Sequence, residues 1–303
     1  MSSKTETHSG FRSGHVALLG RPNVGKSTLL NALVGEKLSI VTAKPHTTRN
    51  RILGVLNRPG GQAVFIDTPG FAKRSDRVLH RLMARSFSQT REDADLILLV
   101  TEANRPIDLD LELIDEIAGS GQPAIIVINK IDRLNSREEL LPRIEALSQY
   151  PFAEFVPVSA RSKRNLDALE AAILQHLPAG PALYPEEFRT DKSHAFRAAE
   201  IIREKLMNEL HQEIPYGLAV EIEGMEVGED GRRLIQAVVW IERDSQKAIV
   251  IGKGGQVLKR AGREARYELN RLFAERVHLK LWVKVREHWA DSAEELRRLG
   301  FDT

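Results

Sequence analysis

Gly20-Arg-Pro-Asn-Val-Gly-Lys-Ser27 is the octapeptide on which the fold assignment rests. It fits the pattern G-x-x-x-x-G-K-[ST], whose glycines let successive backbone N–H groups surround phosphate oxygens. The apolar residues 15–19 before it predict a buried strand, and leucines at helical spacing predict a helix over residues 26–34. A strand, a glycine turn and a helix N-terminus in this order predict a phosphate-binding loop, with a chance glycine turn as the alternative.

Two side chains of this loop have specific expected roles. Lys26 is expected to reach the β- and γ-phosphates as a point charge. The Ser27 hydroxyl is expected to bind Mg²⁺.

The composition is that of a soluble globular protein. The chain has 303 residues, 42% of them hydrophobic and 28% charged, and is long enough for one large domain or two. It contains no run of about 18 apolar residues, and the complete absence of Cys excludes disulfides and Cys-based metal or redox sites. Residues 1–13 are polar and lack the apolar centre of a secretory signal, so we expect a cytoplasmic protein.

Apolar strand candidates alternate with helical stretches in the first part of the chain. The strand candidates are residues 63–66, 96–100, 124–128 and 155–158, and the helical stretches are residues 76–89, 108–118, 136–149 and 163–176. This alternation predicts an α/β domain with a mostly parallel sheet and helices on both faces. Proline and glycine then break both patterns, so residues 179–193 are expected to be a linker.

A smaller α+β domain is expected after the linker. Its candidates are a helix over residues 195–210, strands at 218–222 and 234–241, a long helix over 256–273 and a strand at 277–285. The expected division is a polar tail at 1–13, a nucleotide-binding domain at 14–178, the linker at 179–193 and the second domain at 194–303.

Three further motifs indicate which nucleotide the loop binds. Asp67-Thr-Pro-Gly70 and Asn129-Lys-Ile-Asp132 each follow a predicted strand, at the edge where open α/β sheets place their ligands. Asp67 is expected to hold Mg²⁺ through a water, and the Gly70 N–H to meet the γ-phosphate. The Asp132 carboxylate can accept from guanine N1–H and from the exocyclic amino group, a donor pair that adenine lacks. Ser159-Ala160-Arg161 is expected to offer backbone N–H groups to guanine O6.

Residues 37–50, between the first two motifs, show few helix or strand signals. A loop that senses the γ-phosphate needs a group that completes Mg²⁺ coordination only in the triphosphate state. The Thr48 hydroxyl is the preferred candidate and Thr47 is the alternative.

The catalytic arrangement is expected to differ from that of a Ras-type GTPase, because Phe71 stands where such an enzyme has a water-orienting Gln. Backbone groups, another part of the chain or a partner must therefore place the attacking water. The Asn23 amide oxygen is a candidate ligand for a monovalent cation such as K⁺ that would neutralise developing charge. The alternative is that Asn23 only supports the loop.

These inferences assign each motif residue a role. The expected catalytic residues are Asn23, Lys26, Thr48 and Gly70, and the expected metal ligands are Ser27, Thr48 and Asp67. The expected nucleotide contacts are Gly20, Arg21, Pro22, Asn23, Val24, Gly25, Lys26, Ser27, Thr28, Asp67, Thr68, Pro69, Gly70, Asn129, Lys130, Asp132, Ser159, Ala160 and Arg161.

The motifs resemble those of a known family. The phosphate loop, Thr47-Thr-Arg49 and the Asp67 and Asn129 motifs are similar to those of the TrmE/Era branch of translation-associated GTPases, whose members often have an apolar residue where Phe71 stands. The second domain narrows the resemblance to the Era family and its type II KH domain, through residues 200–207, Ile214-Pro-Tyr216, residues 246–255 and Leu281-Trp-Val-Lys-Val285. The resemblance covers nearly all of residues 14–302.

Gly252-Lys-Gly-Gly255 fits the G-x-x-G loop of a KH domain, where missing side chains let a sugar-phosphate backbone approach. Residues 247–286 around it carry eleven Lys and Arg against three Glu, although a solvated helix face would also explain this charge. Aliphatic side chains before the loop could support unstacked bases, unless they are core, and cations after it could track phosphates. The expected RNA-binding residues are Ile249, Ile251, Gly252, Lys253, Gly254, Gly255, Lys259, Arg260 and Arg263.

The resemblance implies a GTPase that uses GTP, GDP and Mg²⁺ and binds the 3′ end of small-subunit (16S) ribosomal RNA during maturation of the 30S subunit. It also implies weak peripheral contact with the cytoplasmic face of the inner membrane, and we expect a monomer. Two other functions stay open: a constitutive RNA-binding module whose nucleotide is structural, and a P-loop small-molecule kinase, for which no motif indicates an acceptor pocket.

Overall fold

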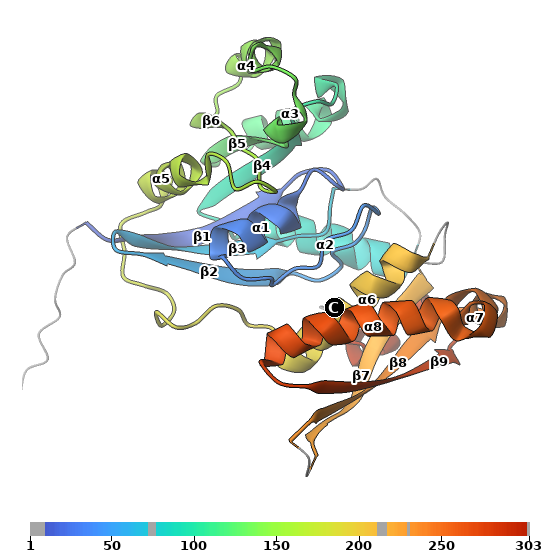
Figure 1. The fold of residues 1–303 in the computed structure, drawn as a ribbon. Coiled ribbons are helices and arrows are strands. Elements are labelled where there is room, and N and C mark those ends of the chain that lie inside the picture. Colours follow the sequence, from blue (N-terminus) through green and yellow to red (C-terminus); the bar gives the residue numbers. More distant parts are fainter. Residues whose placement is uncertain (1–9, 72–76, 211–216, 229–230, 302–303) are drawn as a thin grey trace, which may run out of the picture. The chain divides into compact units, whose positions relative to one another are not determined.

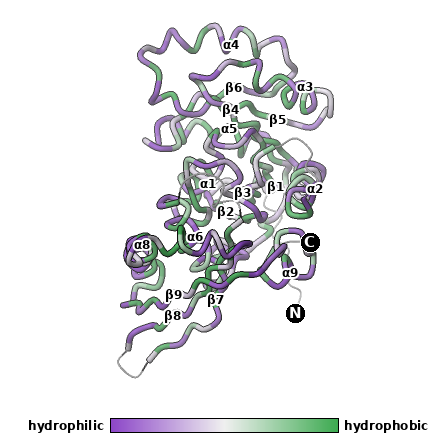
Figure 2. Tube along the Cα trace, turned by 90° about the vertical axis from the view of Figure 1, so that its right-hand side faces the viewer, coloured by the Kyte–Doolittle hydropathy of each residue, from purple (hydrophilic) through white to green (hydrophobic). Residues whose placement is uncertain are grey.

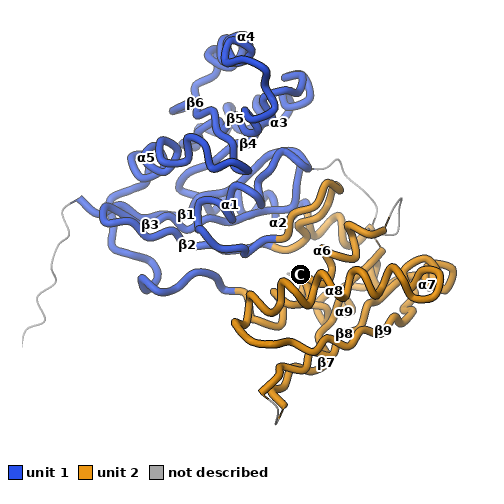
Figure 3. Tube along the Cα trace, in the orientation of Figure 1, with its two compact units in different colours: residues 1–39, 51–72, 84–191 blue, residues 40–50, 73–83, 192–303 orange. Residues whose placement is uncertain are grey.

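The computed structural model describes residues 10–71, 77–210, 217–228 and 231–301, which form two compact units (Figure 1, Figure 3). The first unit comprises residues 1–39, 51–72 and 84–191, and the second comprises residues 40–50, 73–83 and 192–303. Residues 40–50 and the described residues 77–83 therefore pack with the second unit although they lie early in the sequence. The units differ in this respect from the contiguous domains expected from the sequence.

The first unit is built on a six-stranded sheet of order β2-β3-β1-β4-β5-β6. Every neighbouring pair is parallel except β2 and β3, which are antiparallel. The sheet confirms the predicted α/β fold, and β2 is a strand that the sequence analysis missed. The strands are β1 (Arg12–Leu19), β2 (Ile52–Arg58), β3 (Gly61–Asp67), β4 (Leu96–Glu102), β5 (Ala124–Asn129) and β6 (Glu154–Pro157).

Helices cover the sheet because its inner strands are apolar on both faces. Every residue of β4 and β5 is buried, and both strands are green along most of their length in Figure 2. Leu113, Ile114 and Ile117 of α3 pack against the core residues of these strands. The helices are α1 (Lys26–Val34), α2 (Val78–Glu92), α3 (Leu111–Gly119), α4 (Leu141–Ser148) and α5 (Leu166–His176), with short 3₁₀ turns η1 (Ile107–Leu109), η2 (Ile131–Arg133) and η3 (Glu138–Leu140).

The end of the first unit contains the expected linker. Its residues 183 and 184 donate their backbone N–H groups to the side-chain oxygen of Gln62, and Val55 N–H donates to the Arg189 carbonyl. These contacts hold the linker beside β2 and β3, and a turn closed by the Phe188 N–H and the Pro185 carbonyl interrupts it.

The second unit has a three-stranded sheet of order β7-β8-β9, with β7 and β8 antiparallel and β8 and β9 parallel. Helices α6 and α8 pack on one face of it, and the buried Trp289 and the start of α2 pack on the other. Its elements are α6 (His194–Glu209), β7 (Leu218–Val227), β8 (Arg233–Ile241), α7 (Asp244–Ile251), η5 (Lys253–Gly255), α8 (Gln256–Phe273), β9 (Val277–Val285), η6 (Trp289–Asp291) and α9 (Ala293–Arg298).

The second unit has the predicted α+β arrangement. It also contains α7 and α9, two helices that were not predicted from the sequence. Ile214-Pro-Tyr216, one of the stretches that carried the resemblance, lies outside the described residues. Of the helices in the described ranges, none is both long and apolar enough to cross a membrane.

Candidate functional site

The phosphate loop runs from the end of β1 to the start of α1, as its motif predicts. Gly20 and Gly25 both have positive φ angles, of 146° and 105°. A Cβ on Gly20 would lie 2.4 Å from the Val100 carbonyl oxygen, and a Cβ on Gly25 would lie 2.3 Å from Asn129 Nδ2. Both positions therefore need glycine, because the loop passes directly against the ends of β4 and β5.

The Lys26 side chain lies inside the loop. Its Nζ donates to the carbonyl oxygens of Gly20 and Arg21, at 3.0 and 3.1 Å. Burial lowers the pKa of this amine to about 8, an effect that the Asp67 carboxylate opposes. A bound phosphate would add a charged acceptor beside this ammonium and would raise its pKa.

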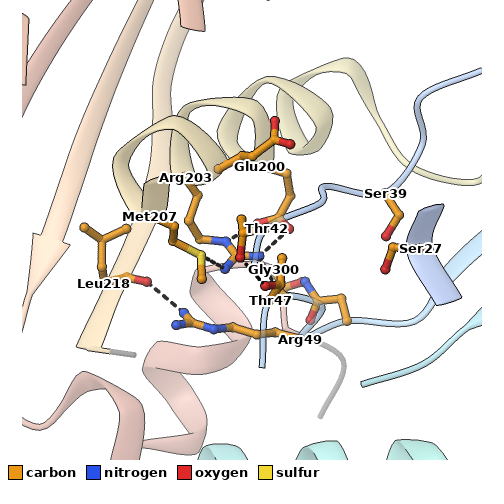
Figure 4. A network of polar contacts seen from close by, with 12 residues as sticks. Ser27, Ser39, Thr42, Thr47, Arg49, Glu200, Arg203, Met207, Leu218 and Gly300 are labelled. Carbon is orange, nitrogen blue, oxygen red and sulfur yellow. Dashed lines mark hydrogen bonds and ion pairs between the residues drawn. The ribbon is translucent and has the colours of Figure 1, made fainter. Parts of the chain in front are cut away.

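Two hydroxyls meet the Asp67 carboxylate at the end of β3. Ser27 Oγ and Ser39 Oγ donate to the same oxygen, Oδ2, at 2.7 and 2.8 Å, and the two serines lie beside each other in Figure 4. Asp67 is fully buried. Hydroxyl and carboxylate oxygens fit Mg²⁺, a hard cation that proteins commonly hold with one or two groups plus substrate phosphates. Ser27 and Asp67 are thus brought together as predicted, and Ser39 was missed.

The other predicted metal ligand belongs to the second unit. Thr48 and its alternative Thr47 are both buried there. The assignment of Thr48 to Mg²⁺ stays a prediction. The described residues include no group of three or more His, Asp or Glu side chains that could hold a metal by themselves.

Gly70 lies against the phosphate loop, whereas the Phe71 ring packs away from it beside Phe87. A Cβ on Gly70 would lie 2.8 Å from the Pro22 backbone, so the third motif approaches the phosphate loop as closely as glycine allows. The Phe71 N–H donates to the Gly20 carbonyl at 3.1 Å, while its ring packs beside Phe87, with centroids 5.5 Å apart. The Phe71 ring is therefore part of the hydrophobic core, as its chemistry suggests. The Thr68 hydroxyl donates to the Leu18 carbonyl, and the nucleotide contact predicted for this residue stays a prediction.

Asn129 joins three loops of the site. Its Nδ2 donates to the Val24 carbonyl at 2.9 Å, and its Oδ1 accepts from the Ala160 N–H at 3.0 Å. The side chain is buried. The Ala160 N–H that the sequence assigns to guanine O6 is thus engaged by Asn129 in the structure, and its contact with a base stays a prediction.

Lys130, which follows β5, contacts the phosphate loop through its side chain. It has a positive φ of 65°, and its Nζ donates to the Asn23 carbonyl at 2.6 Å. The same ammonium lies 2.8 Å from the carboxylate of Glu102. Burial lowers the pKa of Lys130, and the hydrogen bond and charge of Glu102 oppose that shift.

Glu102 is a site residue that the sequence analysis missed. It is the last residue of β4, is 3% exposed, and also pairs with Arg133 at 2.9 Å. An acidic residue at the carboxyl end of a mostly apolar parallel strand is a signal that could have identified it.

Asp132 lies in η2 and is exposed, as a residue that contacts a base should be. The Ser159 hydroxyl donates to Asp132 Oδ1 at 2.6 Å. Ser159 thereby fixes the orientation of the carboxylate, which is a role beyond the backbone contact predicted for it. Arg161 is exposed at the same edge.

The predicted G-x-x-G turn of the second unit links α7 to α8. Gly252, Gly254 and Gly255 have φ angles of 75°, 60° and 77°. A Cβ on Gly252 would lie 2.5 Å from Val257 Cγ2, whereas a Cβ on Gly254 would meet no atom within 4 Å. Gly252 is therefore required by internal packing, and Gly254 leaves an open surface that another molecule could approach.

The side chains around this turn divide into accessible and engaged groups. Ile249 is 52% exposed, Val250 is the core residue of the apolar triplet, and Ile251 is half-buried. Lys253, Lys259 and Arg263 are exposed, with Arg263 3.6 Å from Glu264. Arg260 pairs with Glu209 at 2.7 Å, so it would have to leave a carboxylate to bind a phosphate.

Residues 40–50, which contain the candidate sensing threonines, pack against α6 and β7 within the second unit. Arg203 Nη2 donates to the Thr47 carbonyl at 2.6 Å, and Arg49 Nη1 donates to the Leu218 carbonyl at 2.7 Å (Figure 4). The Lys44 ammonium donates to two carbonyls at the C-terminal end of α6. Burial, reinforced by the charge of Arg203, lowers the pKa of Arg49 to about 9.

Comparisons with known proteins show which family the chain resembles. The family described as 50S ribosome-binding GTPase matches residues 15–130, and the KH domain family matches residues 213–290. The chain is 45% identical over 300 residues to the GTPase Era of Xanthomonas axonopodis pv. citri, covering 98% of this chain and 100% of the relative. It is 44% identical to the GTPase Era of Glaesserella parasuis, covering 95% of this chain and 96% of the relative.

Solved structures of Era proteins are also similar to this chain over nearly its whole length. The Aquifex aeolicus Era Y63A variant bound to GDP and AlF₄⁻ is similar with a TM-score of 0.91 and 40% identity, covering 96% of this chain and 100% of that one. A structure of Era in complex with MgGDPNP and nucleotides 1506–1542 of 16S ribosomal RNA also has a TM-score of 0.91 and 40% identity, covering 97% of this chain and all of that one.

The lowered pKa of Lys26 predicts that nucleotide binding is coupled to proton uptake in alkaline solution. At pH 9, above the pKa of about 8, most Lys26 amines of the nucleotide-free protein are neutral, and bound phosphates would raise that pKa. GDP binding should then take up close to one proton, with Lys130 contributing in the same direction. Calorimetry in two buffers of different ionisation enthalpy measures this number. Uptake that does not change between about pH 6.5 and pH 9 would contradict the assignment.

The contact between Ser159 and Asp132 predicts a change in base preference. Ser159→Ala should weaken GDP binding about tenfold, because one charge-assisted hydrogen bond that orients the carboxylate is lost. Binding of IDP, which lacks the exocyclic amino group, should weaken less. Titration with both nucleotides measures the ratio, and Ser162→Ala, a change at an exposed neighbour, is the control. An unchanged GDP to IDP ratio would argue against this role for Ser159.

Proposed function

This chain belongs to the GTPase Era family and is a GTPase, and we propose that it is a guanine-nucleotide switch that binds the 3′ region of 16S ribosomal RNA and assists maturation of the 30S subunit. The Era relative with bound nucleotide and 16S RNA supports the choice of ligand. The KH family match and the G-x-x-G turn support RNA binding by the second unit.

The position of residues 40–50 favours a switch over a constitutive RNA-binding module. These residues contain the candidate γ-phosphate sensor Thr48, and they pack in the same unit as the G-x-x-G turn. Two contacts hold this segment on α6: Arg203 of α6 donates to the Thr47 carbonyl, and Lys44 of the segment donates to the Met207 carbonyl. If GTP and Mg²⁺ recruit Thr48, their binding competes with these contacts. A ligand that favours one of two states of such a segment shifts the population of the whole unit.

The proposed RNA surface consists of Ile249, the turn at 252–255, and Lys253, Lys259 and Arg263. The open space at Gly254 lets a sugar-phosphate backbone approach the turn. Ile249 offers an exposed aliphatic surface to an unstacked base, and the cations can bind phosphates along a single strand. Ile251 and Arg260 contribute less in the unbound protein, because one is half-buried and the other is paired.

We further propose that the protein is a cytoplasmic monomer with weak peripheral contact with the inner membrane. The resemblance to the Era family supports this proposal. Separation of a cell lysate into soluble and membrane fractions tests the location.

The nucleotide-gating proposal predicts that RNA affinity depends on the bound nucleotide. A fluorescent single-stranded RNA of the 16S 3′ end should bind at least fivefold more tightly to the protein with a GTP analogue than with GDP, measured by anisotropy. Equal affinities would support the constitutive module instead.

The same assay tests the RNA surface through its dependence on salt. Lys259→Ala should reduce the slope of log affinity against log salt by about 0.7, because one phosphate contact to a single strand is lost. Lys163→Ala, a change to an exposed lysine of the first unit, should leave the slope unchanged. If the two variants give the same slope, Lys259 does not contact RNA.

We propose that a K⁺ ion assists hydrolysis at Asn23. This residue has a positive φ of 65°, and its carbonyl accepts from Lys130, so the backbone that carries its amide is held within the phosphate loop. GTP turnover should be several-fold faster in K⁺ than in Na⁺ at equal ionic strength, and Asn23→Ala should remove the difference. Equal turnover of the original protein in the two salts would end the proposal.

A further inference from the structure

Ser39 is held at the metal site by a clamp that none of the sequence motifs includes. Asn31 of α1 accepts from the backbone N–H groups of Leu38 and Ser39 through Oδ1, both at 2.9 Å. Its Nδ2 donates to the Ser39 carbonyl at 2.7 Å. One amide side chain thus satisfies three backbone groups, which fixes the chain immediately after α1.

The clamp directs the Ser39 hydroxyl to the Asp67 carboxylate. The residue is 2% exposed, and its Oγ donates to Oδ2 at 2.8 Å. Ser27, the expected Mg²⁺ ligand, donates to the same oxygen at 2.7 Å. All four residues, including Asn31, lie in the first unit.

We propose that Ser39 is a positioning residue for Mg²⁺. Its hydroxyl fixes the rotation of the Asp67 carboxylate beside Ser27, so that the two oxygens expected to contact the hydrated metal are already in place when nucleotide arrives. Groups that hydrogen-bond a metal-associated carboxylate orient it and raise metal affinity, and their loss typically costs 10- to 100-fold in affinity.

The location of Ser39 in the chain gives this role a further consequence. Ser39 is the last residue of the first unit before the chain enters residues 40–50 of the second. The hydrogen bonds of Asn31 would therefore keep Ser39 and Asp67 in place when residues 40–50 rearrange. Mg²⁺ bound by Ser27 and Asp67 would be retained in the GDP state, while a ligand such as Thr48 could respond to the γ-phosphate.

The test measures Mg²⁺ dependence of GDP release rather than catalysis. Release of a fluorescent GDP analogue is followed in the full chain as Mg²⁺ is titrated. Ser39→Ala should raise the Mg²⁺ concentration that half-maximally slows release about tenfold, with the release rate in excess EDTA unchanged. The matched control is Ser86→Ala, which removes a buried α2 hydroxyl that has no hydrogen-bond partner among the described residues. A half-saturating Mg²⁺ concentration equal in the two variants would overturn the proposal.

A double variant separates positioning from a general structural effect. If Asn31 acts by placing Ser39, Asn31→Ala should also weaken Mg²⁺ binding, and Asn31→Ala with Ser39→Ala should be no weaker than Ser39→Ala alone. Additive losses would show that the two residues act independently, which would contradict the clamp. Changes in the melting temperature of the metal-free protein that leave the Mg²⁺ titration unaltered would show that Ser39 is merely structural.

Discussion

The hydrogen bonds of the Asn129 amide are the constraint on which the nucleotide site depends. This buried side chain joins the phosphate loop at Val24 to the loop after β6 at Ala160, and it occupies the space that a side chain on Gly25 would need. The glycine pattern of the phosphate loop and the asparagine of a motif more than 100 residues later are therefore two parts of one packing requirement. Because each loop follows its own parallel strand, the order of the sheet is sufficient to bring them together.

Charge is balanced around this centre by residues from the ends of β3 and β4, the start of α1 and the turn after β5. Lys26 and Lys130 are partly or fully withdrawn from water, and Asp67 and Glu102 are the carboxylates that oppose their lowered pKa values. Burying these two amines disfavours their charged forms. Phosphates that bind beside them would offset this cost, and the offset would contribute to nucleotide affinity. The Era family supplies the identity of the ligand, and this local balance explains why an anion should bind there.

The sequence predicted the parts of the structure that depend on neighbours in the chain. Helix α1 has the predicted bounds, and the four predicted strands after β1 are each found within a few residues, because apolar runs and glycine turns are local signals. Strand β2 was missed since it is the antiparallel edge strand and contains Gly54, and α7 was missed since only Val250 of its apolar triplet is buried. Asn31, Ser39 and Glu102 belong to no contiguous motif, because their roles arise from hydrogen bonds and ion pairs across the fold.

The chain passes from one unit to the other after residues 39, 50, 72, 83 and 191. A fragment that begins at residue 192 would keep Arg203 in α6 but lose the Thr47 carbonyl that accepts from it, leaving a buried guanidinium with one acceptor fewer. It would also lose Leu79 and Met83 from the core around Trp289. A contiguous fragment that begins at residue 192 therefore lacks parts of the second unit and could not be transferred to another protein as an intact unit. Residues 40–50 and 77–83 lie in sequence between parts of the first unit but pack in the second, so substitutions in them must be compatible with the second unit's core.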